Sequence, residues 1–279
     1  MKLEPGIPYI ENYRKVLKSE LFLEMEDFSN GFLHDNSRFL ATYNRKWVVN
    51  PLHQWSRRWE YPYVYSIIKQ YLFYPPKSEY HVLDAGSGVT FFPYYLVSQL
   101  KNIRVTGCDY DASFEAIINN INSASKKTVN FLKTNLQEIP LEDESVDIVY
   151  CVSVLEHTNN FELILKEFKR VLKPTGIFIL TFDISLDGIS DISPSIAEEL
   201  LQTSVKYFNP LDAVENYPLI EAVKNENILT THYIRQLNKD WLPWKYPLLS
   251  TLKSAFIKRR FPISLTKNLT FYCQSFIVK

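Results

Sequence analysis

The stretch 81–90, HVLDAGSGVT, carries residue types suited to holding a nucleotide-like ligand. A short apolar run ends at Asp84, and Gly86 and Gly88 follow with only Ser87 between them. Glycine adopts backbone angles that other residues avoid and lets a ligand approach the main chain closely. We therefore predict a buried strand, a tight turn that lies against the ligand, and then a helix.

A glycine turn of this kind also occurs in dinucleotide-binding sites. A dinucleotide site needs the pattern GxGxxG, in which the third glycine lets the helix pack closely beneath a pyrophosphate. Phe91 stands at that third position here. A bulky ring at this point argues against NAD.

An alternation of apolar runs and amphipathic segments extends from this turn. We predict strands over His81–Asp84, Ile103–Asp109, Val129–Lys133, Val146–Val154 and Ile177–Phe182. We predict helices over Phe91–Leu100, Ser113–Asn122, Asn160–Leu172 with Asn159 as its cap, and Pro194–Phe208. The run 146–154 is nearly all apolar, as a central strand covered on both faces must be.

The alternation predicts an α/β fold with a doubly wound, mostly parallel sheet, which binds ligands at the carboxyl ends of its strands. Leu269–Val278 is predicted as a closing edge strand, with one more strand near Ile228–Tyr233.

The first 78 residues lack this alternation and have mixed helical spacing, which predicts a helical N-terminal extension. Pro75-Pro76 marks the boundary between this extension, residues 1–78, and a second domain, residues 79–279, which carries an insertion around 209–262.

The overall composition is neutral, with 31 Lys plus Arg against 31 Asp plus Glu, so no general field attracts nucleic acid. The three cysteines have no metal-ligand spacing and are expected to be buried free thiols, with no metal site. No apolar run approaches the roughly 20 residues of a bilayer span, and no signal sequence is recognisable at the amino terminus. We expect a cytoplasmic protein with no stable membrane insertion.

Five motifs in order resemble those of the class I S-adenosylmethionine-dependent methyltransferases. They are VLDAGSG, VTGCDYD, NLQEIP, VDIVYCVSVLEH and RVLKPTG. The resemblance covers roughly Tyr80 to Asp183 plus the last strand, and it implies a Rossmann-like sheet of seven strands with an antiparallel C-terminal strand. Departures are Thr90 at the family's third glycine, Asn135 where an acidic residue is common, and Thr175 in the PGG turn.

The resemblance implies S-adenosylmethionine as cofactor and S-adenosylhomocysteine as product. It assigns the glycine turn to the amino acid portion of the cofactor, Asp84 to its ammonium group and Asp109 to its ribose hydroxyls. Adenine contacts fall to Tyr110, Asn135 and Leu136. The methionine side is lined by Val152 and Ser153.

Simpler interpretations of the same residues stay open. Asp84 and Asp109 can cap the turns that follow them, and Tyr110 can be ordinary surface packing.

A catalytic base is needed only where the acceptor carries a proton. His157 is the first candidate because imidazole exchanges protons near neutrality, and Glu156 is the second. Both side chains can equally serve to shape the site.

The stretch WSRRWEYPYVY, residues 55–65, suggests that the extension supplies an acceptor pocket or a lid, with Arg58, Glu60 and Tyr61 as substrate-binding residues. An arginine there is suited to a carboxylate or other anionic group. Helix packing with exposed arginines explains the pattern equally well.

The sequence thus predicts a methyltransferase acting at oxygen or nitrogen of a small-molecule or sugar-containing metabolite. An RNA or protein acceptor is the alternative within enzymes, although CVSV follows the central strand where a base-handling tetrapeptide would stand. A non-catalytic cofactor-binding scaffold or regulatory partner is the alternative outside them. The segment 241–261 combines aromatic and basic residues, which suits either a lipid contact or a solvated face. The acceptor and the oligomeric state are not predictable.

Overall fold

The structure is a computed structural model that describes residues 3–43, 50–72, 77–188, 191–212, 218–242 and 267–279. The predicted boundary at Pro75-Pro76 and most of the segment 241–261 lie outside these ranges. The first helices are α1 (Ile10–Val16), α2 (Glu20–Asp35), α3 (Ser37–Leu40) and α4 (Arg57–Tyr71), with a 3-10 turn, η2, at Pro51–His53.

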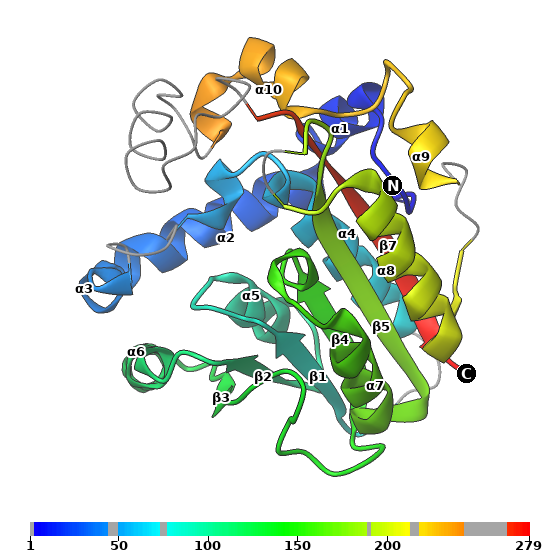
Figure 1. Cartoon of the computed structure of the whole chain (residues 1–279). Coiled ribbons are helices and arrows are strands. Elements are labelled where there is room, and N and C mark those ends of the chain that lie inside the picture. Colours follow the sequence, from blue (N-terminus) through cyan, green and yellow to red (C-terminus); the bar gives the residue numbers. More distant parts are fainter. Residues whose placement is uncertain (1–2, 44–49, 73–76, 189–190, 213–217, 243–266) are drawn as a thin grey trace, which may run out of the picture.

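The centre of the molecule is a sheet of seven strands in the order β3-β2-β1-β4-β5-β7-β6 (Figure 1). The strands are β1 (Tyr80–Ala85), β2 (Ile103–Asp109), β3 (Asn130–Lys133), β4 (Val146–Val152), β5 (Leu172–Ser185), β6 (Phe208–Pro210) and β7 (Leu269–Val278). Strands β1 to β5 are parallel, and β7 is antiparallel to β5 and β6. The predicted doubly wound sheet is confirmed, with the three-residue strand β6 lying outside β7.

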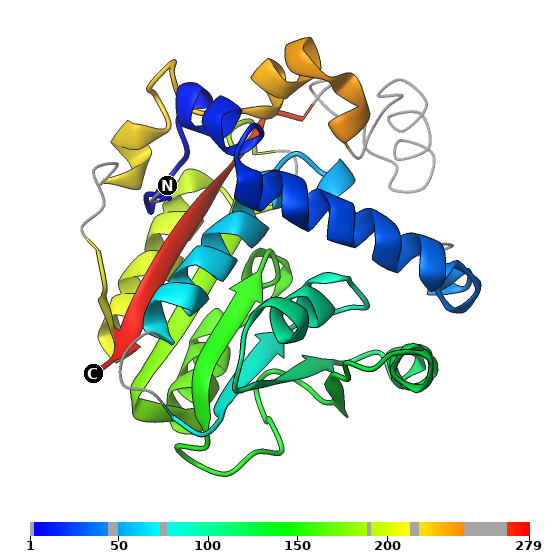
Figure 2. The same ribbon diagram turned by 180° about the vertical axis from the view of Figure 1, so that it is seen from behind.

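Helices cover both faces of the sheet. Helices α4, α5 (Phe92–Gln99) and α6 (Ser113–Ala124) cover one face, and α7 (Phe161–Val171) and α8 (Pro194–Tyr207) cover the other (Figures 1 and 2). Side chains alternate between the two cores along β5: Ile177 and Ile179 enter the first, Phe178 and Leu180 the second. Burial on both faces is why the central strands read as continuous apolar runs.

The N-terminal helices share a core with the sheet. Trp55, just before α4, packs edge-on against Phe271 of β7, with ring centroids 5.1 Å apart. Tyr61 of α4 stacks on Phe92 of α5, with centroids 4.4 Å apart. The aromatic residues of this stretch therefore bring the first turn of α4 to the sheet.

Several predicted element boundaries need correction. The cap of α7 is Asn160, not Asn159, because the Asn160 side chain accepts from the amide of Leu163. Strand β5 is longer than predicted and absorbs the Pro174–Gly176 turn as an irregularity in its pairing with β4. The prediction of a further strand near Ile228–Tyr233 is wrong, because the Thr230 side chain caps helix α10 (Thr231–Leu237) there.

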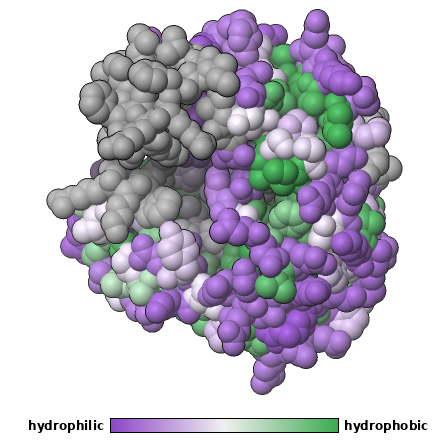
Figure 3. Space-filling model, viewed as in Figure 1, coloured by the Kyte–Doolittle hydropathy of each residue, from purple (hydrophilic) through white to green (hydrophobic). Residues whose placement is uncertain are grey.

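The remaining short elements are η3 (Leu155–His157), α9 (Leu219–Ala222) and η4 (Lys239–Trp241). All three cysteines are buried and free, which confirms that part of the prediction. Across the described ranges no helix has both the length and the apolar character needed to cross a membrane. The face that carries α7 and α8 is largely hydrophilic, with apolar residues in small separate groups (Figure 3).

Candidate functional site at the carboxyl ends of the strands

The turn after β1 has a backbone that only glycine adopts easily. Gly86 has a φ of 79° and Gly88 a φ of 52°. A Cβ on Gly86 would lie 2.5 Å from Cγ2 of Val154, and one on Gly88 would lie 2.6 Å from the Tyr43 hydroxyl oxygen. Backbone strain and crowding therefore both exclude a side chain from this turn.

Asp109, the last residue of β2, holds the turn in place. One of its carboxylate oxygens accepts from the amide of Gly88 (3.0 Å), and the other accepts from the amide of Asp111 (3.3 Å). The amide of Ser87 donates to the carbonyl of Cys108 (3.0 Å), so β2 also fixes the turn through its main chain. The Asp109 carboxylate keeps acceptor capacity that a ligand hydroxyl can use.

Asp84 is a buried carboxyl at the centre of the sheet. It is only 5% exposed and pairs in register with Gly107 of β2 and Tyr150 of β4. Burial raises the pKa of Asp84 to about 8, although the neighbouring Tyr150 hydroxyl opposes this effect. A cationic group beside Asp84 would relieve the cost of its burial. This end of the turn therefore fits an ammonium-bearing ligand.

Tyr43 is a site residue that no sequence motif revealed. It is 7% exposed, its ring packs on Phe114 of α6 with centroids 5.3 Å apart, and its hydroxyl lies over the glycine turn. Burial raises the pKa of the Tyr43 phenol, and the negative charges of Asp109 and Asp84 raise it further. The N-terminal extension thus places one phenol within reach of both acids.

The adenine-side residues predicted from the sequence lie on loops after β2 and β3. Tyr110 directly follows Asp109 and is 71% exposed, whereas Leu136 is 9% exposed. The Asn135 side-chain oxygen accepts from the amide of Gln137 (3.0 Å), which closes the loop on itself. Tyr110 is therefore available to a ligand, and Leu136 gives the loop an apolar anchor.

Ser153, at the end of β4, meets the first turn of α4. It has a φ of 49°, and its hydroxyl donates to Oε1 of Glu60 over 3.0 Å. Arg57 donates to the Ser153 hydroxyl (2.6 Å) and forms an ion pair with Glu60. The adjacent residue Val152 is half-buried. The structure thus brings the predicted residues Glu60 and Ser153 together.

Arg58 lies apart from this contact. Its guanidinium pairs with Glu26 of α2 (3.1 Å) and covers the ring of Trp241, 3.9 Å from the ring centroid. Tyr61 faces the glycine turn. Burial raises the pKa of its phenol, the nearby Asp84 raises it further, and a hydrogen bond with Thr90 lowers it. Of the three predicted substrate residues, Glu60 and Tyr61 therefore face the strand ends, and Arg58 joins α4 to the α2 side.

The two predicted bases have different surroundings. Glu156 is 6% exposed, and its Oε1 accepts from the amide of Asp183 (2.9 Å). The His157 side chain is 59% exposed, and its Nδ1 lies 3.6 Å from an oxygen of Asp191. Partial desolvation of the ring lowers the pKa of His157, which favours the neutral imidazole. Glu156 is built into the wall, and His157 is open to a ligand.

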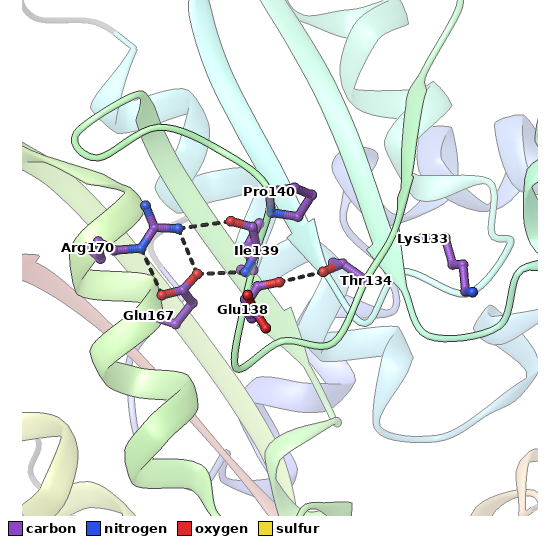
Figure 4. Close-up of a pocket in the computed structure, with 7 residues that line it drawn as sticks. All are labelled: Lys133, Thr134, Glu138, Ile139, Pro140, Glu167 and Arg170. Carbon is purple, nitrogen blue, oxygen red and sulfur yellow. Dashed lines mark hydrogen bonds and ion pairs between the residues drawn. The ribbon is translucent and has the colours of Figure 1, made fainter.

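A cavity of about 550 Å³ lies between the loop after β3 and helix α7 (Figure 4). Arg170 donates to the carbonyls of Ile139 and Leu141 (2.9 Å each) and forms an ion pair with Glu167 (2.7 Å). Glu167 in turn accepts from the amide of Ile139 (2.6 Å). These groups satisfy one another, and they fix the loop that carries Asn135.

The comparisons with known proteins agree with this arrangement. Residues 83–180 match the family model described as a methyltransferase domain. The chain is 24% identical over 164 residues to a tRNA U34 carboxymethyltransferase of Nautilia profundicola, covering 58% of this chain and 54% of that protein. It is 28% identical over 172 residues to a sterol 24-C-methyltransferase of Schizosaccharomyces pombe, covering 60% and 45%. The chain thus spans about half the length of these relatives.

A similar fold occurs in the solved structure of the [4+2]-cyclase SpnF, at 16% identity and a TM-score of 0.51. The likeness covers 81% of this chain and 82% of that one. At this identity the likeness concerns the fold alone.

Proposed function

Because this chain carries a class I S-adenosylmethionine-dependent methyltransferase domain, we propose that it transfers the methyl group of this cofactor to a small-molecule or sugar-containing metabolite. The acceptor atom is oxygen or nitrogen. The observation that carries the proposal is the glycine turn, held by Asp109 and flanked by the buried carboxyl of Asp84.

The residues of the site fit the cofactor. The ammonium group is assigned to Asp84, whose buried carboxyl lacks a cationic partner among its described hydrogen bonds and ion pairs. The ribose hydroxyls are assigned to Asp109, which keeps acceptor capacity. Tyr110, Asn135 and Leu136 are assigned to the adenine, and Val152 and Ser153 to the methionine side.

When bound, this cofactor supplies a methyl group already activated on a sulfonium. The protein then has to align the acceptor lone pair with the methyl carbon and exclude water. Tyr43 and the first turn of α4 support such exclusion, because both are buried over the strand ends.

We assign the base, where a hydroxyl acceptor needs one, to His157 rather than Glu156. Its half-exposed ring has a lowered pKa and is ready to take a proton, whereas Glu156 already supports the end of β5. Glu156 then holds the end of β5 through the Asp183 amide and does not act as the base. A His157→Ala variant that keeps its transfer rate within about threefold between pH 6 and 9 would remove the base role.

An RNA or protein acceptor is the second candidate, since one relative is a tRNA U34 carboxymethyltransferase. The equal numbers of basic and acidic residues weigh against a polyanionic acceptor. A non-catalytic cofactor-binding scaffold is the third candidate, because the site's fit to the cofactor does not require turnover.

Calorimetry with S-adenosylhomocysteine and with NAD tests the cofactor site. We expect binding of the former only, and tight NAD binding would overturn the proposal. A screen of metabolites, bulk tRNA and peptides for release of S-adenosylhomocysteine then separates the acceptor classes. Cofactor binding without any turnover across all three classes would favour the scaffold.

A further inference from the structure

Helix α4 packs against β4 and β5, and its first turn lies at the carboxyl ends of these strands (Figure 2). A cluster of polar side chains gathers there. We call it the carboxyl cluster: Arg57, Glu60, Ser153, Glu156 and Asp183. Glu60 is fully buried and bonded to Arg57 and Ser153. Glu156 accepts from the Asp183 amide, and burial and the charge of the Asp183 carboxyl both raise the pKa of Glu156, so these two carboxyl groups are neighbours.

With all of its groups ionised, this cluster would carry more negative than positive charge. Three carboxyl groups face one guanidinium, and Glu60 already occupies that guanidinium. Within the described residues, Oε2 of Glu156 and Oδ1 of Asp183 are buried and have no hydrogen-bond partner. A buried carboxyl oxygen without a partner is costly, and a hydrogen-bond donor or a cation removes that cost.

A third polar group faces the same space. Thr181 is fully buried, and its hydroxyl has no partner among the described residues. It lies two residues before Asp183 on β5, so both side chains point to the α4 face of the sheet. Its register partner is Cys273 on β7, whose thiol is within electrostatic reach of Glu60, Asp183 and Arg57. Thr181 therefore points into the carboxyl cluster.

We propose that the carboxyl cluster is the acceptor subsite and that the acceptor is a basic amine. The amine nitrogen would lie between Asp183, Glu156 and the Thr181 hydroxyl. This inference rests on the proposed function, since it places the acceptor beside Ser153 at the methionine side of the cofactor site.

The chemistry of transfer suits this arrangement. The protonated amine loses one proton to the Asp183 carboxylate, and the nitrogen lone pair forms the new N–C bond. The S–C bond breaks as this bond forms, its electron pair stays on sulfur, and the positive charge passes to the methylated nitrogen. Burial raises the pKa of Asp183 to about 8, so this carboxyl releases a proton to solvent as the cationic amine binds, and it can take a proton back from the amine during transfer.

Matched probe pairs test the amine class directly. The pairs are glucosamine with glucose and phenethylamine with 2-phenylethanol. Within each pair, the amine carries an amino group where the alcohol carries a hydroxyl group. We measure their binding to the full chain by calorimetry in the presence of S-adenosylhomocysteine, and we measure S-adenosylhomocysteine release separately. At least one amine should bind about tenfold more tightly than its alcohol, as expected for a charge-assisted contact.

Variants locate the effect. Asp183→Asn should reduce this preference about tenfold, and the milder change Thr181→Val should reduce it a few-fold, while the affinity for S-adenosylhomocysteine stays within about twofold. Glu221→Gln removes an exposed carboxylate on helix α9 and should leave the preference unchanged. If Asp183→Asn does not fold, Thr181→Val alone decides.

Equal binding of amines and alcohols, no amine binding at all, or an unchanged preference in the cluster variants would overturn the amine subsite. A preference that disappears with EDTA would also overturn it, because the cluster would then hold a metal ion. Failure of S-adenosylhomocysteine itself to bind would instead refute the proposed function.

Discussion

The hydroxyl of Tyr43 occupies the space that a side chain on Gly88 would need. A Cβ on Gly88 would lie 2.6 Å from the hydroxyl oxygen but 3.7 Å from the ring carbon that carries it. One residue of the N-terminal extension is therefore fitted to the glycine turn through a single atom.

Gly88→Ala should weaken both stability and cofactor binding. Alanine at a φ of 52° costs about 1 kcal/mol of unfolding free energy, and the contact with Tyr43 adds to that cost. We expect affinity for S-adenosylhomocysteine to fall at least tenfold, measured by calorimetry alongside thermal unfolding.

The double variant Gly88→Ala/Tyr43→Phe separates strain from crowding. Removing the hydroxyl leaves an ordinary 3.7 Å contact, so the double variant should recover part of the stability lost in Gly88→Ala. Strictly additive effects of the two changes would show that the contact has no energetic weight.

Asp109→Asn and Asp109→Ala should differ in effect. Asparagine keeps an oxygen for the Gly88 amide but loses the charged acceptor for ligand hydroxyls, whereas alanine loses both. Calorimetry should show about a tenfold loss of S-adenosylhomocysteine affinity for Asp109→Asn and a larger loss for Asp109→Ala. Equal losses would mean that the hold on the turn is unimportant.

The predictable part of the molecule is the part with a strong local pattern. Strands β1 and β4 are mostly apolar runs buried on both faces, and glycine at 86 and 88 marks a turn that few other residues can form. The positions of Asp84, Asp109 and Ser153 follow, because parallel strands carry them to one edge of the sheet.

The unpredicted part depends on contacts between distant segments. Strand β6 has three residues, too few for a periodic pattern, and it forms because β7 offers an unpaired edge. Ile228–Tyr233 has apolar residues typical of a strand, yet the Thr230 cap makes it the start of a helix. Tyr43 reaches the glycine turn because α2 packs on α5 and α3 packs on α6, and no sequence motif indicates these contacts.

Asp84→Asn should change stability in a pH-dependent way. Burial raises the folded-state pKa of Asp84 to about 8 from an ordinary value of 3.8, so the folded protein retains a proton that the unfolded chain loses. Stability from this group is complete below pH 3.8 and is lost as pH rises through 8. Asp84→Asn should therefore raise the melting temperature of the ligand-free protein more at pH 9 than at pH 5.

The same variant should weaken S-adenosylhomocysteine binding, because the proposed ammonium partner loses its charge. If Asp84→Asn had the same pH profile of melting temperature as the wild type, the cost of burying the Asp84 carboxylate would already be offset in the folded protein. Unchanged affinity would remove Asp84 from the cofactor site.

Asp147 should be a stability residue without a role in binding. It lies near the start of β4, at the opposite end of this strand from Ser153, and its side chain is 1% exposed. It accepts from Lys77 (2.6 Å), Lys173 (2.8 Å) and the amide of His81 (2.9 Å). Asp147→Asn should cost about 2 to 4 kcal/mol of unfolding free energy, with S-adenosylhomocysteine affinity unchanged.

The pH dependence of this cost follows from the same contacts. Burial alone would raise the pKa of Asp147, but the hydrogen bonds from Lys173 and Lys77 outweigh it and hold the pKa below its ordinary value. The stabilisation is therefore complete at pH 7 and is lost as pH falls below about 4, so the difference between wild type and Asp147→Asn should narrow in acid denaturant titrations. Glu79→Gln breaks an exposed ion pair with Arg104 and should change stability by less than about 0.5 kcal/mol. If the two variants had equal effects, the lysines would contribute no more around Asp147 than an exposed pair does.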